Sequence, residues 1–147
     1  MLEPSAGTGN LITVLLEAGY GENQVIAVER DYTLKTVHEA LFTGLTVLSV
    51  CFLGPRTGID GCGGFHRIVM NPPFRKVKQH MNRALSLLAN GTPESPAVLV
   101  ALVPITYQHP GAELLEELPS DTFATCTVNT KVFQFSVFSD RGTLSHA

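Results

Sequence analysis

The sequence reads Leu2-Glu3-Pro4-Ser5-Ala6-Gly7-Thr8-Gly9-Asn10-Leu11 near its start, and this stretch decides the fold. It predicts a strand stub that ends at Glu3, a glycine-rich turn from Pro4 to Gly9 and a helix over about residues 10–18. Small side chains let a ligand approach the backbone closely, and glycine tolerates a positive φ. Phosphate binding is the weaker interpretation, because the turn lacks both a Gly-Lys-Ser/Thr sequence and the third glycine of the dinucleotide fingerprint.

Strands and helices alternate along the rest of the chain. Apolar runs predict strands at residues 24–28, 46–52, 67–70 and 97–103, and the patterns between and after them predict helices at 32–42, 76–89 and 112–118. The glycine-rich residues 54–64 predict one surface loop. Residues 124–138 predict two strands joined by a turn near Asn129. The predicted fold class is therefore α/β, with a mostly parallel sheet and a C-terminal antiparallel hairpin.

The composition is that of a globular protein. Of the 147 residues 44% are hydrophobic and 16% are charged, which predicts a single domain over residues 1–147. The sequence has no apolar run long enough to span a membrane, so we expect a soluble intracellular protein. A net charge of −3 argues against a domain that binds nucleic acid mainly through its overall charge. One basic cluster fits a solvated helix start as well as a nucleic-acid contact: Arg75, Lys76, Lys78, His80 and Arg83.

The cysteines and histidines form no metal or redox pattern. Cys51, Cys62 and Cys126 are widely spaced without a Cys-x-x-Cys pair, so we expect reduced thiols and no metal site. The histidines also lack ligand spacing. We interpret the following four as surface or helix residues without a catalytic role: His38, His80, His109 and His146.

A carboxylate ends each of the first two predicted strands. Glu3 would repel a pyrophosphate but favour a cationic ligand, such as the sulfonium and amino groups of S-adenosylmethionine. Glu29 ends an apolar run about twenty residues beyond the turn, where a carboxylate can hold ribose hydroxyls. Alone, Glu29 would be read as an ordinary strand-end residue. Together with the glycine-rich turn it indicates ribose binding, and we predict S-adenosylmethionine as the cofactor.

One segment indicates that the group to be modified is an amine, namely Ile68-Val69-Met70-Asn71-Pro72-Pro73-Phe74. Two prolines after a buried strand force the backbone to turn outward and expose a carbonyl. The Asn71 side-chain oxygen and a carbonyl of the Pro72-Pro73 turn could then accept from one amino group, while Phe74 offers a stacking face. An exocyclic amine is a poor nucleophile because it is conjugated with its ring, and two acceptors that favour a tetrahedral nitrogen free its lone pair. Asn71, Pro72, Pro73 and Phe74 are therefore the predicted catalytic residues.

At these residues the chain resembles the class I methyltransferases, and within them the adenine-N6 amino-methyltransferases of restriction-modification systems, phages and plasmids. The resemblance implies a Rossmann-like, N-terminally shortened fold that methylates adenine N6 in DNA. It also implies residence in the cytoplasm of a bacterium or of a phage's host. The cofactor-binding residues that it implies are Glu3, Pro4, Ser5, Ala6, Gly7, Gly9, Glu29, Arg30, Cys51, Phe52 and Asn71.

The sequence departs from this family pattern in four ways. Cys51 stands where related sequences usually carry an acidic residue that meets the adenine amine of the cofactor. His66 replaces another acidic residue just before the catalytic strand. The chain also begins almost at the cofactor loop and carries no separate target-recognition domain. We therefore expect a protein partner or an oligomer to supply the missing N-terminal or target-recognition elements.

Three functions remain open from the sequence. The leading one is methylation of adenine in DNA, with the base flipped out of its stack to lie between Phe74 and the cofactor. The second keeps the chemistry but changes the substrate to guanine N2 in RNA or glutamine in a protein. The third is a catalytically degenerate fold that serves as a binding subunit.

Overall fold

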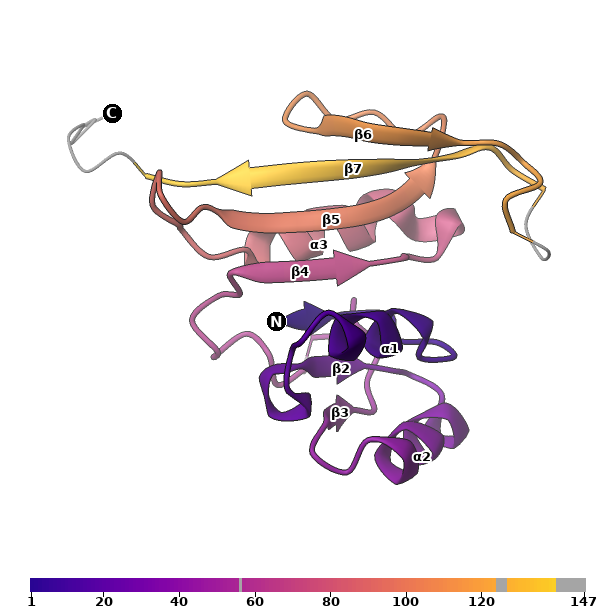
Figure 1. The fold of residues 1–147 in the computed structure, drawn as a ribbon, viewed down its shortest axis with the longest axis vertical. Helices are drawn as coiled ribbons and strands as arrows, with labels where there is room; N and C mark the ends of the chain where they lie inside the picture. The colour runs from indigo at the N-terminus through magenta and orange to yellow at the C-terminus, as the bar shows by residue number, and fades with distance from the viewer. Residues whose placement is uncertain (56, 124–126, 140–147) are drawn as a thin grey trace.

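A computed structural model describes residues 1–55, 57–123 and 127–139 (Figure 1). The strands of the described residues form one seven-stranded sheet in the order β3-β2-β1-β4-β5-β7-β6. They are β1 (Leu2–Glu3), β2 (Ile26–Val28), β3 (Thr46–Leu48), β4 (Arg67–Met70), β5 (Ala97–Pro104), β6 (Glu113–Leu118) and β7 (Thr130–Val137). The helices are α1 (Asn10–Glu17), α2 (Tyr32–Leu41) and α3 (Val77–Leu87), with short 3-10 turns η1 (Glu22–Gln24) and η2 (Phe74–Lys76).

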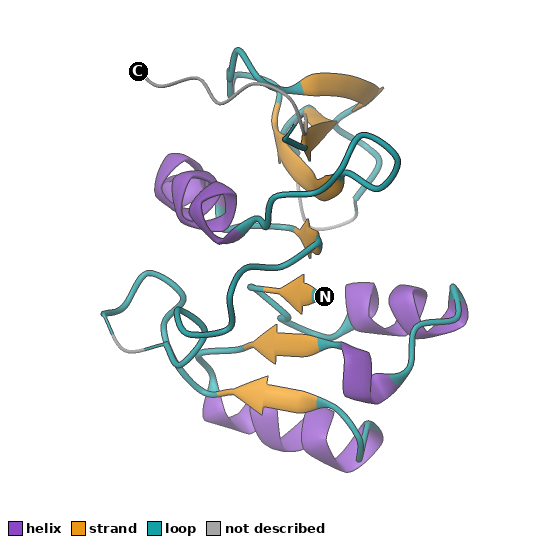
Figure 2. Ribbon diagram, turned by 90° about the vertical axis from the view of Figure 1, so that its left-hand side faces the viewer, coloured by secondary structure: helices purple, strands orange, loops and turns teal. Residues whose placement is uncertain are grey.

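The first five strands of the sheet order run parallel to one another. Leu2 of β1 pairs with Ile26 of β2 on one side and with Ile68 of β4 on the other, so β1 lies inside the parallel region. The chain returns between parallel strands through crossover segments, and Figure 2 shows α1 and α3 on opposite faces of the sheet. This arrangement confirms the predicted α/β, mostly parallel, Rossmann-like fold.

The helix predicted at residues 112–118 is wrong, because these residues form the antiparallel strand β6. Leucines and glutamates in this segment favour a helix by intrinsic propensity. Pairing with β7 overrides that preference: Leu114 lies opposite Phe133, and Leu118 lies opposite Thr130. Within the described ranges, none of the helices has the length and apolar content needed to cross a lipid bilayer.

An antiparallel C-terminal pair closes the sheet, as predicted, but its members differ from the prediction. Asn129 immediately precedes β7, at the end of the connection from β6, so the first strand of the hairpin is β6 and not a strand that begins near residue 124. The partners of β7 are β6 and β5, both antiparallel to it. Residues 124–126 of the predicted first hairpin strand lie outside the described residues.

The hydrophobic core lies on both faces of the sheet. On one face, alternate residues of β5 are buried against α3, and Leu99, Met81 and Ala84 are fully inaccessible. On the other face, Ile12 of α1 packs with residues of β2 and β3 such as Ala27 and Val47. The two clusters hold the helices against the sheet and so fix the loops at its carboxyl edge.

This division between core and edge gives a stability prediction. We expect Leu99→Ala to lower the free energy of unfolding by about 2–5 kcal/mol, because it removes a fully buried side chain and leaves a cavity. Leu115→Ala on β6 is the matched control: its side chain is half-exposed, and we expect a change below about 0.5 kcal/mol. Urea denaturation of both variants measures the difference, and equal losses would contradict the assignment of the core.

Candidate functional site

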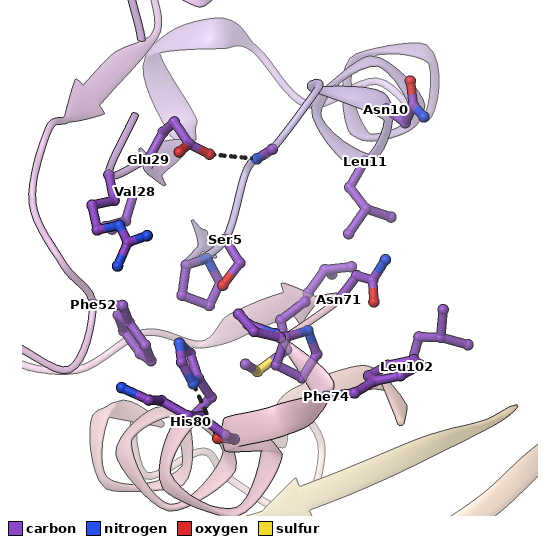
Figure 3. A pocket seen from close by; sticks show the side chains of 18 of the residues that line it. Ser5, Asn10, Leu11, Val28, Glu29, Phe52, Asn71, Phe74, His80 and Leu102 are labelled. Atoms are coloured by element: carbon purple, nitrogen blue, oxygen red, sulfur yellow. Dashed lines mark hydrogen bonds between the residues drawn. The ribbon is translucent and has the colours of Figure 1, made fainter. Parts of the chain in front are cut away.

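A single cavity of about 1180 Å³ lies at the carboxyl edge of the parallel strands (Figure 3). It is bounded by the turn after β1 and by the segments that follow β2, β3 and β4, which is where open α/β sheets bind ligands. The predicted site residues that line it are Pro4, Ser5, Gly7, Glu29, Arg30, Cys51, Phe52, Asn71, Pro72, Pro73 and Phe74. The predicted residues Glu3, Ala6 and Gly9 are buried and do not line the cavity. They support the turn from its buried side.

The glycine-rich turn is held by hydrogen bonds at Gly7. Its N–H donates to Glu29 Oε2 at 2.7 Å, and its carbonyl accepts from His38 Nε2 at 2.7 Å. The second oxygen of Glu29 accepts from the backbone N–H of Asp31 at 2.7 Å. A carboxylate oxygen has more than one lone pair, so Glu29 can hold the turn and still accept from ribose hydroxyls.

His38 is a functional residue that the sequence analysis missed. Its side chain is only 1% exposed in α2, so it is a helix residue, one of the two predicted alternatives, and not a surface residue. The ring packs directly against Gly9: a Cβ atom there would lie 2.8 Å from His38 Cε1. The spacing of His38 from Leu34 and Phe42, four residues on either side, was the available signal, since it places the three on one helical face.

Glu3 is fully buried at the end of β1. One carboxyl oxygen accepts from the Ser5 N–H at 2.9 Å, and the other is buried without a partner among the described residues. Burial raises the pKa of Glu3 to about 8; the Ser5 bond opposes the shift, and the nearby charge of Glu29 adds to it. A cation bound beside this carboxyl would favour its charged form. The unpartnered oxygen and the small-residue turn therefore fit a cationic, ribose-bearing ligand such as S-adenosylmethionine.

The Asn-Pro-Pro-Phe turn presents its polar groups at the cavity. Asn71 is exposed and Phe74 is partly exposed, and Figure 3 shows both at the cavity wall. The Pro73 carbonyl already accepts from Lys76 N at 3.0 Å, which closes η2. No backbone hydrogen bond to the Pro72 carbonyl is formed within the described residues, so it is the less engaged of the two proline carbonyls predicted as the second acceptor.

The segment after β3 turns away from the sheet sooner than predicted. The strand ends at Leu48, and Phe52 packs against His80 of α3 with ring centroids 5.7 Å apart. His80 is 7% exposed and lines the cavity, so it too is a helix residue and not a surface residue. Cys51, next to Phe52, is exposed at the cavity.

The structure divides the basic cluster that follows the catalytic turn. Arg83 pairs with Asp60 at 2.7 Å and His80 is buried. Arg75, Lys76 and Lys78 are the exposed members, and the first two line the cavity.

The remaining histidines and cysteines lie away from the cavity or outside the described residues. His66 is exposed before β4, and His109 packs its ring edge against Phe135. Cys126 and His146 belong to the part of the chain that is not described. Among the described residues, no group of three or more His, Cys, Asp or Glu side chains could hold a metal ion.

The contact between Gly9 and His38 gives a prediction with an internal control. Gly9 and Gly19 both have a positive φ, of 87° and 100°, but no heavy atom lies within 4 Å of a Cβ built on Gly19. We expect Gly19→Ala to cost about 1 kcal/mol of unfolding free energy from backbone strain alone. Gly9→Ala should cost at least about 1 kcal/mol more, because it also displaces a buried ring. Equal losses of unfolding free energy for the two variants in urea denaturation would show that the contact between Gly9 and the His38 ring does not contribute to stability.

The buried carboxyl of Glu3 predicts a pH-dependent stability. Between the unfolded value near 4.5 and the folded pKa of about 8, the folded state holds a proton that the unfolded state releases. Stability from this group is therefore fully present below the lower value and is lost as the pH rises to about 8, by at most about 1.4 kcal/mol per pH unit. Glu3→Gln has no such proton, so its stability relative to the parent should rise with pH. Urea denaturation at several pH values in this window measures the difference, and parallel curves would refute the shift.

Comparison with known proteins identifies the fold. No protein-family model and no curated protein matches the sequence significantly. Among solved structures, TrmN from Thermus thermophilus superposes with a TM-score of 0.64 at 18% identity, over 92% of this chain and 43% of that chain. The N-methyltransferase NodS from Bradyrhizobium japonicum gives 0.63 at 10% identity, over 94% and 85%. A dimethyladenosine transferase from Plasmodium falciparum gives 0.60 at 15% identity, over 92% and 54%.

Sequence identities of 10% to 18% show a shared fold, and they do not show a shared substrate or activity. The chain spans less than half of TrmN and most of NodS. The TM-scores of 0.60 to 0.64 over more than nine tenths of this chain show that its mixed seven-stranded sheet with helices shares the fold of these structures. The chain therefore has the Rossmann-like fold of the class I methyltransferases.

Proposed function

We propose that this chain transfers a methyl group from S-adenosylmethionine to the N6 amine of adenine in DNA. One observation carries the proposal. A single cavity joins the glycine-rich turn and Glu29 to Asn71 and Phe74, which are distant in the sequence. A site for a ribose-bearing cation thus opens onto two acceptors and an aromatic ring that suit an aminated base. One structural neighbour is a dimethyladenosine transferase, which agrees with this choice of acceptor.

The turn after β1 and the end of β2 would hold the cofactor. Glu29 accepts from ribose hydroxyls, and Gly7 leaves the space into which the ligand fits. The carboxyl of Glu3 lies behind the turn, and a positive charge bound in front of the turn would favour the ionised form of this carboxyl. When bound, the cofactor supplies an electrophilic methyl group on a sulfonium.

Asn71 and Pro72 would prepare the amine for attack. The Asn71 side-chain oxygen and the Pro72 carbonyl each accept one hydrogen of the amine, which favours a tetrahedral nitrogen with a free lone pair. Phe74 stacks on the flipped base. Methyl transfer to the amine nitrogen would leave the cofactor as its thioether, and the methylated amine would lose one proton to water.

The same proposal includes the cellular context. The exposed Arg75, Lys76 and Lys78 lie beside the catalytic turn, where they can contact nucleic-acid phosphates. Three basic side chains position a strand without reading its sequence, so a protein partner or a second copy of the chain would supply target recognition. The reaction would take place in the cytoplasm of a bacterium or of a phage's host.

A labelled-methyl assay tests the proposal. The chain is incubated with S-adenosylmethionine carrying a tritiated methyl group and, separately, with unmethylated DNA in single-stranded and duplex form, RNA, or protein. We expect label on adenine N6 of DNA and a loss of at least about 100-fold in Asn71→Ala, because an acceptor aimed at the reacting amine is removed. Asn82→Ala on the exposed side of α3 is the control and should stay within about two-fold of the parent.

Each outcome has a defined meaning. Label on RNA or protein but not on DNA would overturn the substrate while preserving methyl transfer. Transfer that persists in Asn71→Ala would remove Asn71 from the mechanism. Cofactor binding without transfer to any substrate would support the binding-subunit alternative.

A further inference from the structure

His80 is a buried histidine in the cavity wall to which the proposed function gives no role. It lies on α3, is 7% exposed and lines the same cavity as Glu29 and Asn71. Its ring stacks on Phe52 at an interplanar angle of 29° (Figure 3). The contact fixes the ring plane, so the ring nitrogens have defined directions.

The hydrogen bond of His80 to its own helix determines its tautomer. Nδ1 lies 3.1 Å from the Lys76 carbonyl, which can only accept, so Nδ1 carries the hydrogen. Burial lowers the pKa of His80; the bond to the Lys76 carbonyl opposes the shift, and the Lys76 charge adds to it. The ring is therefore neutral at physiological pH, and Nε2 carries a lone pair. Nε2 has no partner among the described residues, yet it is not sealed off from solvent as His38 Nδ1 is.

The strand order shows which part of the cofactor would meet His80. This step rests on the proposed function, in which Glu29 at the end of β2 holds the ribose and Asn71 at the end of β4 faces the methyl group. In the sheet order β3-β2-β1-β4, the methionine part then extends from the ribose toward β4. The adenine ring must extend the other way, over the end of β3, where Phe52 contacts His80.

Few groups in this part of the wall can accept a hydrogen bond. Val50, Phe52 and Leu53 are apolar, and the thiol of Cys51 is a weak acceptor. The charged side chains of Arg30, Arg75 and Lys76 line the same cavity but only donate. The His80 lone pair is the strong side-chain acceptor next to Phe52.

We propose that His80 Nε2 accepts a hydrogen bond from the exocyclic amine of the cofactor's adenine and so selects an amino-purine over an oxo-purine. In this arrangement Glu29 binds the ribose, and Phe52 and His80 form one wall of the adenine pocket. His80 Nε2 then contacts the substituent at position 6 of the purine ring. An oxo group at that position would place a second acceptor against the lone pair, which is unfavourable in a partly desolvated pocket.

Binding measurements without catalysis test this role. The parent chain is titrated calorimetrically with S-adenosylhomocysteine and with S-inosylhomocysteine, which differs by an oxo group in place of the amine. We expect the parent to prefer the amino compound by at least about ten-fold. His80→Phe keeps a ring beside Phe52 but has no acceptor, and its preference should fall to within about three-fold. His80→Gln still offers an oxygen acceptor and should retain most of the preference.

The outcomes separate this inference from the proposed function. A parent chain that binds neither compound refutes the proposed cofactor site itself. A parent that binds both equally, or a folded His80→Phe variant that discriminates as well as the parent, overturns the role of His80 and leaves the cofactor site intact. Thermal unfolding establishes which variants are folded. If His80→Phe is not folded, His80→Leu, which also lacks an acceptor, takes its place: a folded variant that keeps the parental preference overturns the role of His80.

Discussion

The geometry of the cavity depends on how the two peptide groups that flank Gly7 are held. The N–H of one is fixed by Glu29 at the end of β2, and the carbonyl of the other is fixed by His38 in α2. Two sequentially distant elements thus set the position of a turn that has no large side chains of its own to pack. The left-handed backbone of Gly9 completes the turn and leaves just enough room for the His38 ring. The floor of the cavity is therefore rigid, although it consists mostly of backbone.

The features that the sequence predicted well are those that short segments encode. The strand that ends in Asn-Pro-Pro-Phe and the turn from Pro4 to Gly9 follow from local chemistry, and both lie at the cavity. The roles of His38 and His80 depend on which elements pack against α2 and α3, and a single sequence does not state this. The strand β6 was missed because pairing with β7 decides its conformation against its helix propensity. Phe52 was placed in a strand because its apolar neighbours continue the pattern, whereas its contact with His80 draws the segment off the sheet.

The cavity and the turn behind it combine one neutral acid and one neutral base with charged donors. Glu3 holds its proton near neutral pH and His80 lacks one, in both cases chiefly because burial disfavours the charged form. The exposed cations Arg30, Arg75 and Lys76 supply the positive side of the same cavity. The carboxylate of Glu29, which accepts from two backbone amides, supplies negative charge at the end of β2. Positive charge, negative charge and a neutral acceptor thus lie at different places around the cavity. This distribution suits a ligand with a cationic end and a polar base.

Among the described strands, β6 lies at the edge of the sheet and has a hydrogen-bonded neighbour on one side only. Such an edge can recruit a strand from another copy of the protein, more so because Leu114 and Leu115 are half-exposed. The carboxylates of Glu113, Glu116 and Glu117 lie on this strand and would face their own copies in such a pair. Their mutual repulsion would oppose such edge-to-edge pairing. The acidic residues that favour a helix in this segment would thus also protect the edge of the sheet from aggregation.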